Sequence, residues 1–325
     1  MTRRFPFRID RKYLPVMVTI ALFCTTFLAA SLKYRGFGTP QVFFNMLIDN
    51  SFIIISAIGV TFVLLTGGID LSMGAMIAFT SMVSAALVEK VHLSPFITIP
   101  TVLALGALIG AGMGAIITYY KVPPFIATLA GMFLTRGLCF IISIDAVPIN
   151  DPFYKAVSLY QIPIWGKAFI SINVVITLVV VLLAVYVAHY TRFGRTVYAI
   201  GGGEQSALLM GLPVKRTKVL VYTLNGFCSA LAGVVYSFYM LSGYGYYANG
   251  FELDIIASAV IGGTLLSGGV GYVVGTVFGV LIQGIIQNII MFEGTLNSWW
   301  TRIVVGLLTL FFIVMQRALS SIKNK

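Results

Sequence analysis

Long apolar runs separated by short polar segments cover almost the whole chain. A helix needs about 20 mainly apolar residues to cross a bilayer. Ten runs near this length are present: 13–32, 42–66, 72–88, 95–118, 124–144, 168–188, 217–240, 253–270, 271–292 and 298–318. The pattern predicts an all-α polytopic membrane protein of about ten transmembrane helices, in which residues 1–325 form a single transmembrane domain.

The run 253–270 differs from the others because glycines interrupt it twice, at 262–263 and 268–269. Non-helical backbone is tolerated at membrane depth only where it is buried in protein or lines a water-filled cavity. Two interpretations of this run therefore stay open: a full span, and a broken or re-entrant helix.

The basic residues predict the orientation of the spans, because cytoplasmic loops of membrane proteins are enriched in lysine and arginine. With the N-terminus inside and ten alternating spans, five basic residues fall outside: Lys33, Arg35, Lys90, Lys155 and Lys167. Fourteen fall inside: Arg3, Arg4, Arg8, Arg11, Lys12, Lys121, Arg192, Arg195, Lys215, Arg216, Lys218, Arg317, Lys323 and Lys325. This count places both termini in the cytoplasm and puts the loops 145–167 and 189–218 on opposite faces.

Composition excludes several classes of protein. Hydrophobic residues make up 59% of the 325 residues and charged residues only 10%, whereas a soluble domain carries about 25% charged residues. The net charge of +11 comes from basic residues at helix ends, so orientation in membrane lipid explains it and no nucleic-acid partner is expected. The cysteines and histidines have no metal-like spacing, and we expect no metal site.

The loop 189–218 is the longest polar interruption and carries five basic residues. Within it a short helical run, 204–210, lies between the glycines 201–203 and Gly211. We expect this small helix to dock onto a cytosolic partner. No phosphate-binding pattern GxxxxGK[ST] is present. We therefore expect no catalytic residue and no cofactor in this chain, and any ATP would be bound by another protein.

The motif TGGIDLS at 66–72 interrupts two apolar runs. Asp70 or Ser72 can cap the helix that follows by accepting hydrogen bonds from its free N–H groups. A second interpretation places Asp70 near a gate or a subunit interface. Further along, Pro123 and Pro124 predict a helix start. Arg136 lies about three turns into that helix, where an ionisable side chain is expected to face the protein interior or a water-filled cavity.

Polar residues recur at helical spacing in three other runs, which places each set on one helix face. Such faces either form hydrogen bonds between helices or line a path for a neutral polyhydroxylated solute, and both interpretations stay open. The candidate residues of a translocation pathway are Asn45, Asp49, Asp70, Thr128, Arg136, Tyr222, Asn225, Gln283 and Gln287.

Segments 61–79 and 258–278 have a similar residue pattern, since each has a Gly-Gly pair a few residues before Leu-Ser. Glycines spaced four residues apart occur after the first segment, at 106, 110 and 114, and at the end of the second, at 271, 275 and 279. An internal repeat of the kind found in transporters would produce this similarity. The shared glycine-rich composition would explain it equally well.

Four motifs resemble the sugar-importing ABC permeases of the ribose/xylose type, in the same order along nearly the whole chain. They are TGGIDLS at 66–72, VPPFIATLAGMFLTRG at 122–137, TRFGRTVYAIGGGEQSALLMGL at 191–212 and AVIGGTLLSGGVG at 259–271. PINDP at 148–152 and GTLNSWWTRI at 294–303 are most similar to the permeases of galactofuranose importers.

The resemblance implies a bacterial inner-membrane subunit of a binding-protein-dependent importer. Its partners would be a cytosolic ABC ATPase, a second homologous permease subunit and a periplasmic sugar-binding protein. The galactofuranose systems imply a heterodimer of permeases, although a homodimer stays open. The coupling helix of the family maps onto these residues: Gly203, Glu204, Gln205, Ser206, Ala207, Gly211 and Leu212. Many relatives place Glu where this chain has Gln205, so the residue that contacts the ATPase is undecided between Glu204 and Gln205.

The resulting hypothesis is import of a monosaccharide, with galactofuranose as the first candidate, by alternating access driven by ATP hydrolysis in another subunit. An ion- or proton-coupled secondary sugar carrier is the alternative. The apolar runs contain no obvious chain of buried acid–base residues for proton transfer, which favours the first hypothesis.

Overall fold

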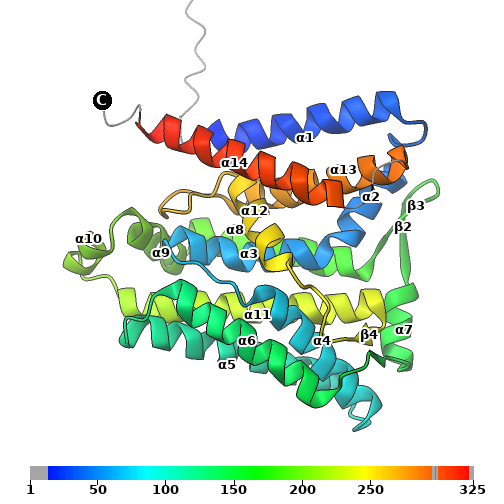
Figure 1. Cartoon of the computed structure of the whole chain (residues 1–325), viewed down its shortest axis with the longest axis horizontal. Coiled ribbons are helices and arrows are strands. Elements are labelled where there is room, and N and C mark those ends of the chain that lie inside the picture. The colour runs from blue at the N-terminus through cyan, green and yellow to red at the C-terminus, as the bar shows by residue number, and fades with distance from the viewer. Residues whose placement is uncertain (1–13, 295–296, 298, 322–325) are drawn as a thin grey trace, which may run out of the picture.

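The computed structural model describes residues 14–294, 297 and 299–321 (Figure 1). Its helices are α1 (Leu14–Lys33), α2 (Pro40–Asp49), α3 (Ser51–Leu65), α4 (Met73–Glu89), α5 (Pro95–Tyr119), α6 (Pro124–Ile142), α7 (Pro152–Leu159), α8 (Ile172–Tyr190), α9 (Arg192–Gly202), α10 (Glu204–Leu209), α11 (Val214–Met240), α12 (Phe251–Ile261), α13 (Val273–Glu293) and α14 (Trp299–Ser321). The strands are β1 (Val147–Pro148), β2 (Gln161–Trp165), β3 (Ala168–Ser171) and β4 (Ser242–Gly243).

The protein is a polytopic helical membrane protein, as the sequence predicts. Within the described residues, six helices are long and apolar enough to cross a bilayer: α1, α5, α6, α8, α11 and α13. The pair α2 and α3 counts as a seventh span, bent by 57°. The other three predicted spans correspond to shorter apolar helices, namely α4 with 17 residues, α12 with 11 and the stretch Trp299–Met315 of α14. The number of ten spans is therefore not confirmed.

The predicted run 42–66 is two helices because the chain bends at Asn50. The backbone of Asn50 leaves the helical region (φ −105°, ψ 8°), and its side-chain amide donates to the carbonyl of Met46 at 2.9 Å. A local side-chain bond of this kind competes with the helical pattern. Hydrophobicity alone carries no sign of it, since the residues on both sides of the bend are apolar.

The prediction of a helical membrane protein is confirmed, and two small antiparallel sheets accompany the helices among the described residues. The first four residues of the predicted run 168–188 form β3, which pairs with β2 so that Gln161 faces Ser171. β1 pairs with β4, far apart in sequence. A short apolar stretch cannot be assigned to helix or strand by composition, which explains the misassignment of 168–171.

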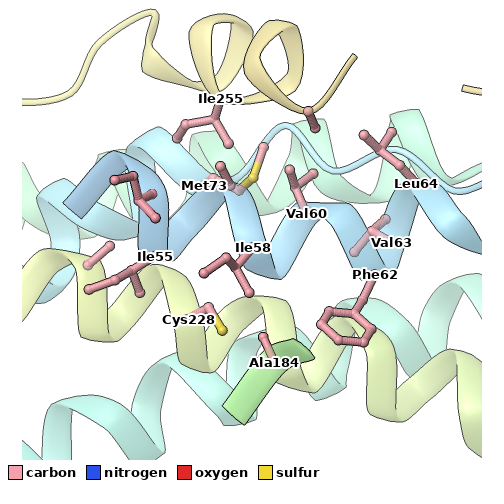
Figure 2. Packing of buried hydrophobic residues seen from close by; sticks show 14 of the residues in the cluster. Ile55, Ile58, Val60, Phe62, Val63, Leu64, Met73, Ala184, Cys228 and Ile255 are labelled. Atoms are coloured by element: carbon pink, nitrogen blue, oxygen red, sulfur yellow. The ribbon is translucent and has the colours of Figure 1, made fainter. Parts of the chain in front are cut away.

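Helix α3 is the centre of the bundle, and every one of its 15 residues is buried. A helix that is apolar on all sides is expected in a core. Figure 2 shows Ile58 and Phe62 of α3 between side chains from four other helices, labelled Met73, Ala184, Cys228 and Ile255. These belong to α4, α8, α11 and α12, so α3 connects the two halves of the chain.

The predicted glycine ladder of α5 packs directly on α11. A β-carbon at Gly110 would lie 2.3 Å from the carbonyl oxygen of Tyr222, and one at Gly226 would lie 2.3 Å from that of Gly106. Small residues at this spacing let two membrane helices approach closely. The second ladder acts similarly, since a β-carbon at Gly279 would lie 2.0 Å from the carbonyl of Ser258 in α12.

The two long loops lie at opposite ends of the bundle. Figure 1 shows α9 and α10 at one end, together with the first turn of α1 and the last turn of α14. The β2–β3 hairpin and α7 lie at the other end. The assignment of the α10 end to the cytoplasm rests on the basic residues and stays a prediction. The termini themselves, residues 1–13 and 322–325, lie outside the described part of the chain.

We predict that Gly110→Val destabilises the protein while Gly112→Val does not. Valine at 110 must displace the backbone of α11, and such overpacking costs about 1–3 kcal/mol. A β-carbon at Gly112, on the same helix, would have no neighbouring atom within 4 Å. The thermal midpoint of the detergent-solubilised protein measures the effect. Equal midpoints for the two variants would contradict this close helix crossing.

Candidate functional site

Helix α10 is a short helix that is buried on one side and exposed on the other. Ala207 is fully buried with Ile200 of α9 and Val214 of α11. Leu212, partly buried, packs against this cluster. On the opposite side Leu209 is 90% exposed, and its neighbours Leu208 and Met210 are exposed as well. A large apolar tip in a polar loop is typical of a protein-binding surface.

A salt bridge holds the first residue of this helix, and a glycine follows its last turn. Glu204 forms a salt bridge of 2.7 Å with Lys218 of α11, while Gln205 and Ser206 are exposed. At the other end Gly211 has a φ of +74°, a conformation that side chains with a β-carbon disfavour. Glu204 is thus held by its own chain, and Gln205 is the free side chain of the pair that the sequence left undecided.

Helix α9 connects α10 to two breaks in the membrane helices, at 66–72 and 262–272. A β-carbon at Gly201 would lie 1.9 Å from the carbonyl oxygen of Leu65 and 2.2 Å from the amide of Gly269. Gly269 itself donates to Leu65 at 2.9 Å. The break 66–72 connects α3 to α4, and the break 262–272 connects α12 to α13. The end of α9 therefore packs at the point where these two breaks contact each other.

A tyrosine adds a second contact between α9 and the later break. The hydroxyl of Tyr198 donates to the carbonyl of Gly271 at 2.7 Å. Burial raises the pKa of Tyr198 to about 12, so the phenol keeps its proton and stays a donor. The predicted run 253–270 is a broken helix: α12 ends at Ile261. The backbone directly after it, at 262–264, is buried in protein, as non-helical backbone in a membrane requires, while Leu266 and Ser267 are exposed.

Three of the predicted pathway residues meet at the first break. The carboxylate of Asp70, fully buried, accepts from the backbone amide of Ser72 at 2.7 Å and from its hydroxyl at 2.6 Å. Its other oxygen accepts from the side-chain amide of Asn225 at 2.7 Å. The hydroxyl of Thr128 accepts from the amide of Leu71 at 3.2 Å. This arrangement supports the interpretation of Asp70 as the residue that closes the turn before α4.

Two further candidates are also held inside the protein. Tyr222 is buried beside the same break, since a β-carbon at Gly68 would lie 2.5 Å from its hydroxyl. Arg136 of α6 donates to the carbonyl oxygens of Gly245 and Tyr247, at 2.6 and 2.7 Å. Arg136 therefore faces protein and fixes the loop before α12.

The other four candidates lie apart from Asp70. Asn45 and Asp49 of α2 are exposed, and Asp49 accepts from the hydroxyl of Tyr239 at 3.1 Å. Gln283 is buried and donates to the carbonyl of Asp254 at 3.0 Å. Gln287 is exposed and, with Gln283, lines a cavity of about 550 Å³ between α12, α13 and α14.

The sequence matches, over residues 42–313, the family described as the branched-chain amino acid transport system / permease component. The chain belongs to this permease family. The permease is 47% identical to the inner membrane ABC transporter permease protein YjfF of Escherichia coli (strain K12), over 95% of this chain and 94% of that one.

Two other relatives carry the name of a sugar. The permease is 38% identical to the fructose import permease protein FruG of Bifidobacterium longum (strain NCC 2705), over 97% of this chain and 94% of that one. It is 37% identical to the ribose import permease protein RbsC of Escherichia coli (strain K12), over 86% of this chain and 87% of that one. No solved structure matches. The permease is thus a multi-pass inner-membrane component of an ABC transporter, and a transport subunit.

Two charged residues of this permease were absent from the predicted site. Asp254 and Arg302 line the same cavity as Gln283 and Gln287. Both lie within predicted apolar runs, and an ionisable residue in such a run is itself a signal of a functional position. Their proximity could not be predicted, because α12 and α14 are separated in sequence by the whole of α13.

We predict that Asp70→Ala destabilises the permease much more than Asp145→Ala. Removing Asp70 leaves the amides of Ser72 and Asn225 buried without an acceptor, and each such hydrogen bond to a charged group is worth about 1.5–3 kcal/mol. Asp145 is exposed and serves as the matched carboxylate. Thermal midpoints in detergent measure both changes. A midpoint for Asp70→Ala equal to that of the unaltered protein would exclude this role in closing the turn.

Proposed function

We propose that this permease is the membrane subunit of an ATP-driven sugar importer, which moves a monosaccharide inward by alternating access. The observation that carries the proposal is the connection from the exposed tip of α10, through Gly201 at the end of α9, to both helix breaks. The relatives named for fructose and ribose import support a sugar as the substrate. The ATP is hydrolysed by a separate cytosolic ABC ATPase that docks on α10.

Motion is transmitted in this proposal as a rigid-body displacement. Closure of the ATPase dimer moves α10, and the buried contacts of Ala207 carry the movement to α9. Because Gly201 lies against the last residue of α3 and against Gly269 of the later break, its displacement changes the position of α12 relative to α3, and α4 follows through the break 66–72. Two short helices that begin or end inside the bundle can rock without breaking long helical ladders, which is the usual basis of alternating access in carriers with discontinuous helices.

Two more partners complete the proposed importer. A periplasmic sugar-binding protein docks at the end that carries α7 and the β2–β3 hairpin, and a second homologous permease closes the path from the side. We take galactofuranose as the first candidate substrate and a heterodimer as the first candidate assembly. Both rest on the motifs PINDP and GTLNSWWTRI. Residues 295, 296 and 298 of the second motif lie outside the described part of the chain.

The decisive experiment is reconstitution of the permeases with and without the ATPase. The complex is purified through a tag on this chain, placed in vesicles loaded with ATP, and supplied with the sugar-binding protein and a labelled sugar such as galactofuranose. The proposal expects accumulation against the gradient only when the ATPase and ATP are present. Accumulation driven by an ion gradient without nucleotide would instead identify a secondary carrier.

We predict that Gly201→Ala uncouples ATP hydrolysis from transport while Gly202→Ala has no effect. A methyl group at 201 collides with the backbone of both breaks, whereas nothing lies within 4 Å of one at 202. A shift of about 1.4 kcal/mol between conformations changes their ratio tenfold, so we expect at least that loss in sugar transported per ATP hydrolysed. Equal coupling ratios in the two variants would exclude the transmission route through α9.

We predict that Leu209→Asp weakens ATPase binding while Leu159→Asp does not. Burial of a leucine at an interface contributes about 1.5–3 kcal/mol, so its loss weakens binding by roughly tenfold or more. Leu159 is 75% exposed and lies in α7, at the other end of the bundle. Co-purification of the ATPase measures the effect. Full recovery of the ATPase with Leu209→Asp would show that the tip of α10 is not the docking surface.

A further inference from the structure

A cavity lined by both apolar and polar side chains lies between three helices, and none of its lining residues belongs to the two breaks. Its volume is about 550 Å³, and α12, α13 and α14 all contribute side chains. Figure 1 shows these three helices side by side, with the lining ends of α13 and α14 toward the end that carries the β2–β3 hairpin. Six of the lining residues bear on its chemistry: Phe251, Asp254, Gln283, Gln287, Trp299 and Arg302.

The carboxylate of Asp254 and the guanidinium of Arg302, which carry opposite charges, both line this cavity. Among the described residues, the Asp254 carboxylate accepts no hydrogen bond and the Arg302 guanidinium donates none. The guanidinium carbon of Arg302 lies 5.0 Å from the centre of the Trp299 ring, and only the backbone carbonyl of Asp254 is bonded, by Gln283. Asp254 and Arg302 interact electrostatically with each other, but their hydrogen-bonding capacity is left unused. Charged groups are costly in lipid, so this cavity favours water or a polar ligand that supplies those hydrogen bonds.

The lining fits one class of ligand. The carboxylate accepts from hydroxyl groups, the guanidinium donates to their oxygens, and the amide of Gln287 does both. The rings of Phe251 and Trp299 offer apolar surface for C–H groups. Asp254 and Arg302 cancel in charge, which favours a neutral solute over an ion. A volume of about 550 Å³ lies within the usual 300–1,000 Å³ of small-molecule sites.

We propose that this cavity is a low-affinity binding site for a neutral monosaccharide on the outer half of its path. The inference deepens the proposed function and rests on it. Asp254 and Arg302 bind the hydroxyl groups, while the contact of Gln283 with Asp254 fixes α12 relative to α13. Weak binding suits a solute in transit, since it must be able to leave the site again.

The test measures whether sugar protects a thiol placed in the cavity. Gln287→Cys is introduced after Cys24→Ser, which removes the exposed native cysteine and leaves the buried Cys139 and Cys228. The full complex in vesicles is treated with a charged, membrane-impermeant thiol reagent, with and without D-galactose. The matched control is Ala156→Cys, an exposed position on α7, which lies outside the membrane spans and contributes no side chain to the cavity.

The proposal expects labelling at 287 to slow as D-galactose is added. With a Kd of about 10 mM, about 100 mM sugar slows it roughly tenfold, because the rate falls as 1 + [L]/Kd. The control at 156 is labelled at a rate that sugar does not change. Labelling at 287 that sugar does not change, or that only a lipid-soluble reagent achieves, would overturn the proposal. Neither result touches the proposed function, which fails only if the unaltered complex does not accumulate sugar with ATP.

A second measurement does not depend on the cysteine. Asp254→Asn and Arg302→Gln are expected to lower the transport rate at saturating sugar-binding protein about tenfold each, while the ATPase still co-purifies. A loss of about 1.4 kcal/mol corresponds to that factor. Transport at the full rate in both variants would contradict a role of these charges in binding sugar.

Discussion

The structure depends on satisfying backbone polar groups where membrane helices are interrupted. Inside a bilayer an unpaired N–H or C=O costs several kcal/mol, because no water is available to replace the missing bond. Among the described residues, two such interruptions, 66–72 and 262–272, lie against each other at Gly67 and Gly268, and nearby groups supply their hydrogen bonds. The amide of Gly269 donates to Leu65, Thr128 accepts from Leu71, and Asp70 accepts from Ser72. The two breaks and their hydrogen bonds therefore form one connected polar region inside an apolar bundle, which we call the break region.

The segment α9–α10, to which the proposed function assigns the coupling to an ATPase, also ends at these breaks. Helix α9 ends against the break region. A displacement of α10 would therefore move backbone groups, such as those of Leu65 and Gly269, that cannot separate without losing a buried hydrogen bond. The connection is stiff because its contacts are backbone to backbone, with Gly201 as the point of closest approach. A longer side chain there would introduce rotatable bonds and weaken the transmission of movement.

Much of this arrangement could be predicted from the sequence, because it depends on local composition. Apolar runs mark the helices, glycines mark the breaks, and the polar loop marks α10. The rest depends on contacts between distant segments. The bend at Asn50 arises from one side-chain bond, and the strand at 168–171 needs β2 as its partner. The approach of Asp254 to Arg302 follows from the order in which α12, α13 and α14 pack, which no single-sequence pattern encodes.

The exposed leucine of α10 has a consequence for the supply of subunits. Leu209 is 90% accessible and its neighbours are apolar, so the tip is poorly hydrated until another protein covers it. A copy of the permease made in excess of its partners would keep this surface in contact with water. Exposed hydrophobic surface of this kind makes a protein prone to aggregation, so synthesis of the permease in step with the partner proposed to cover α10 would limit the time for which this surface is exposed.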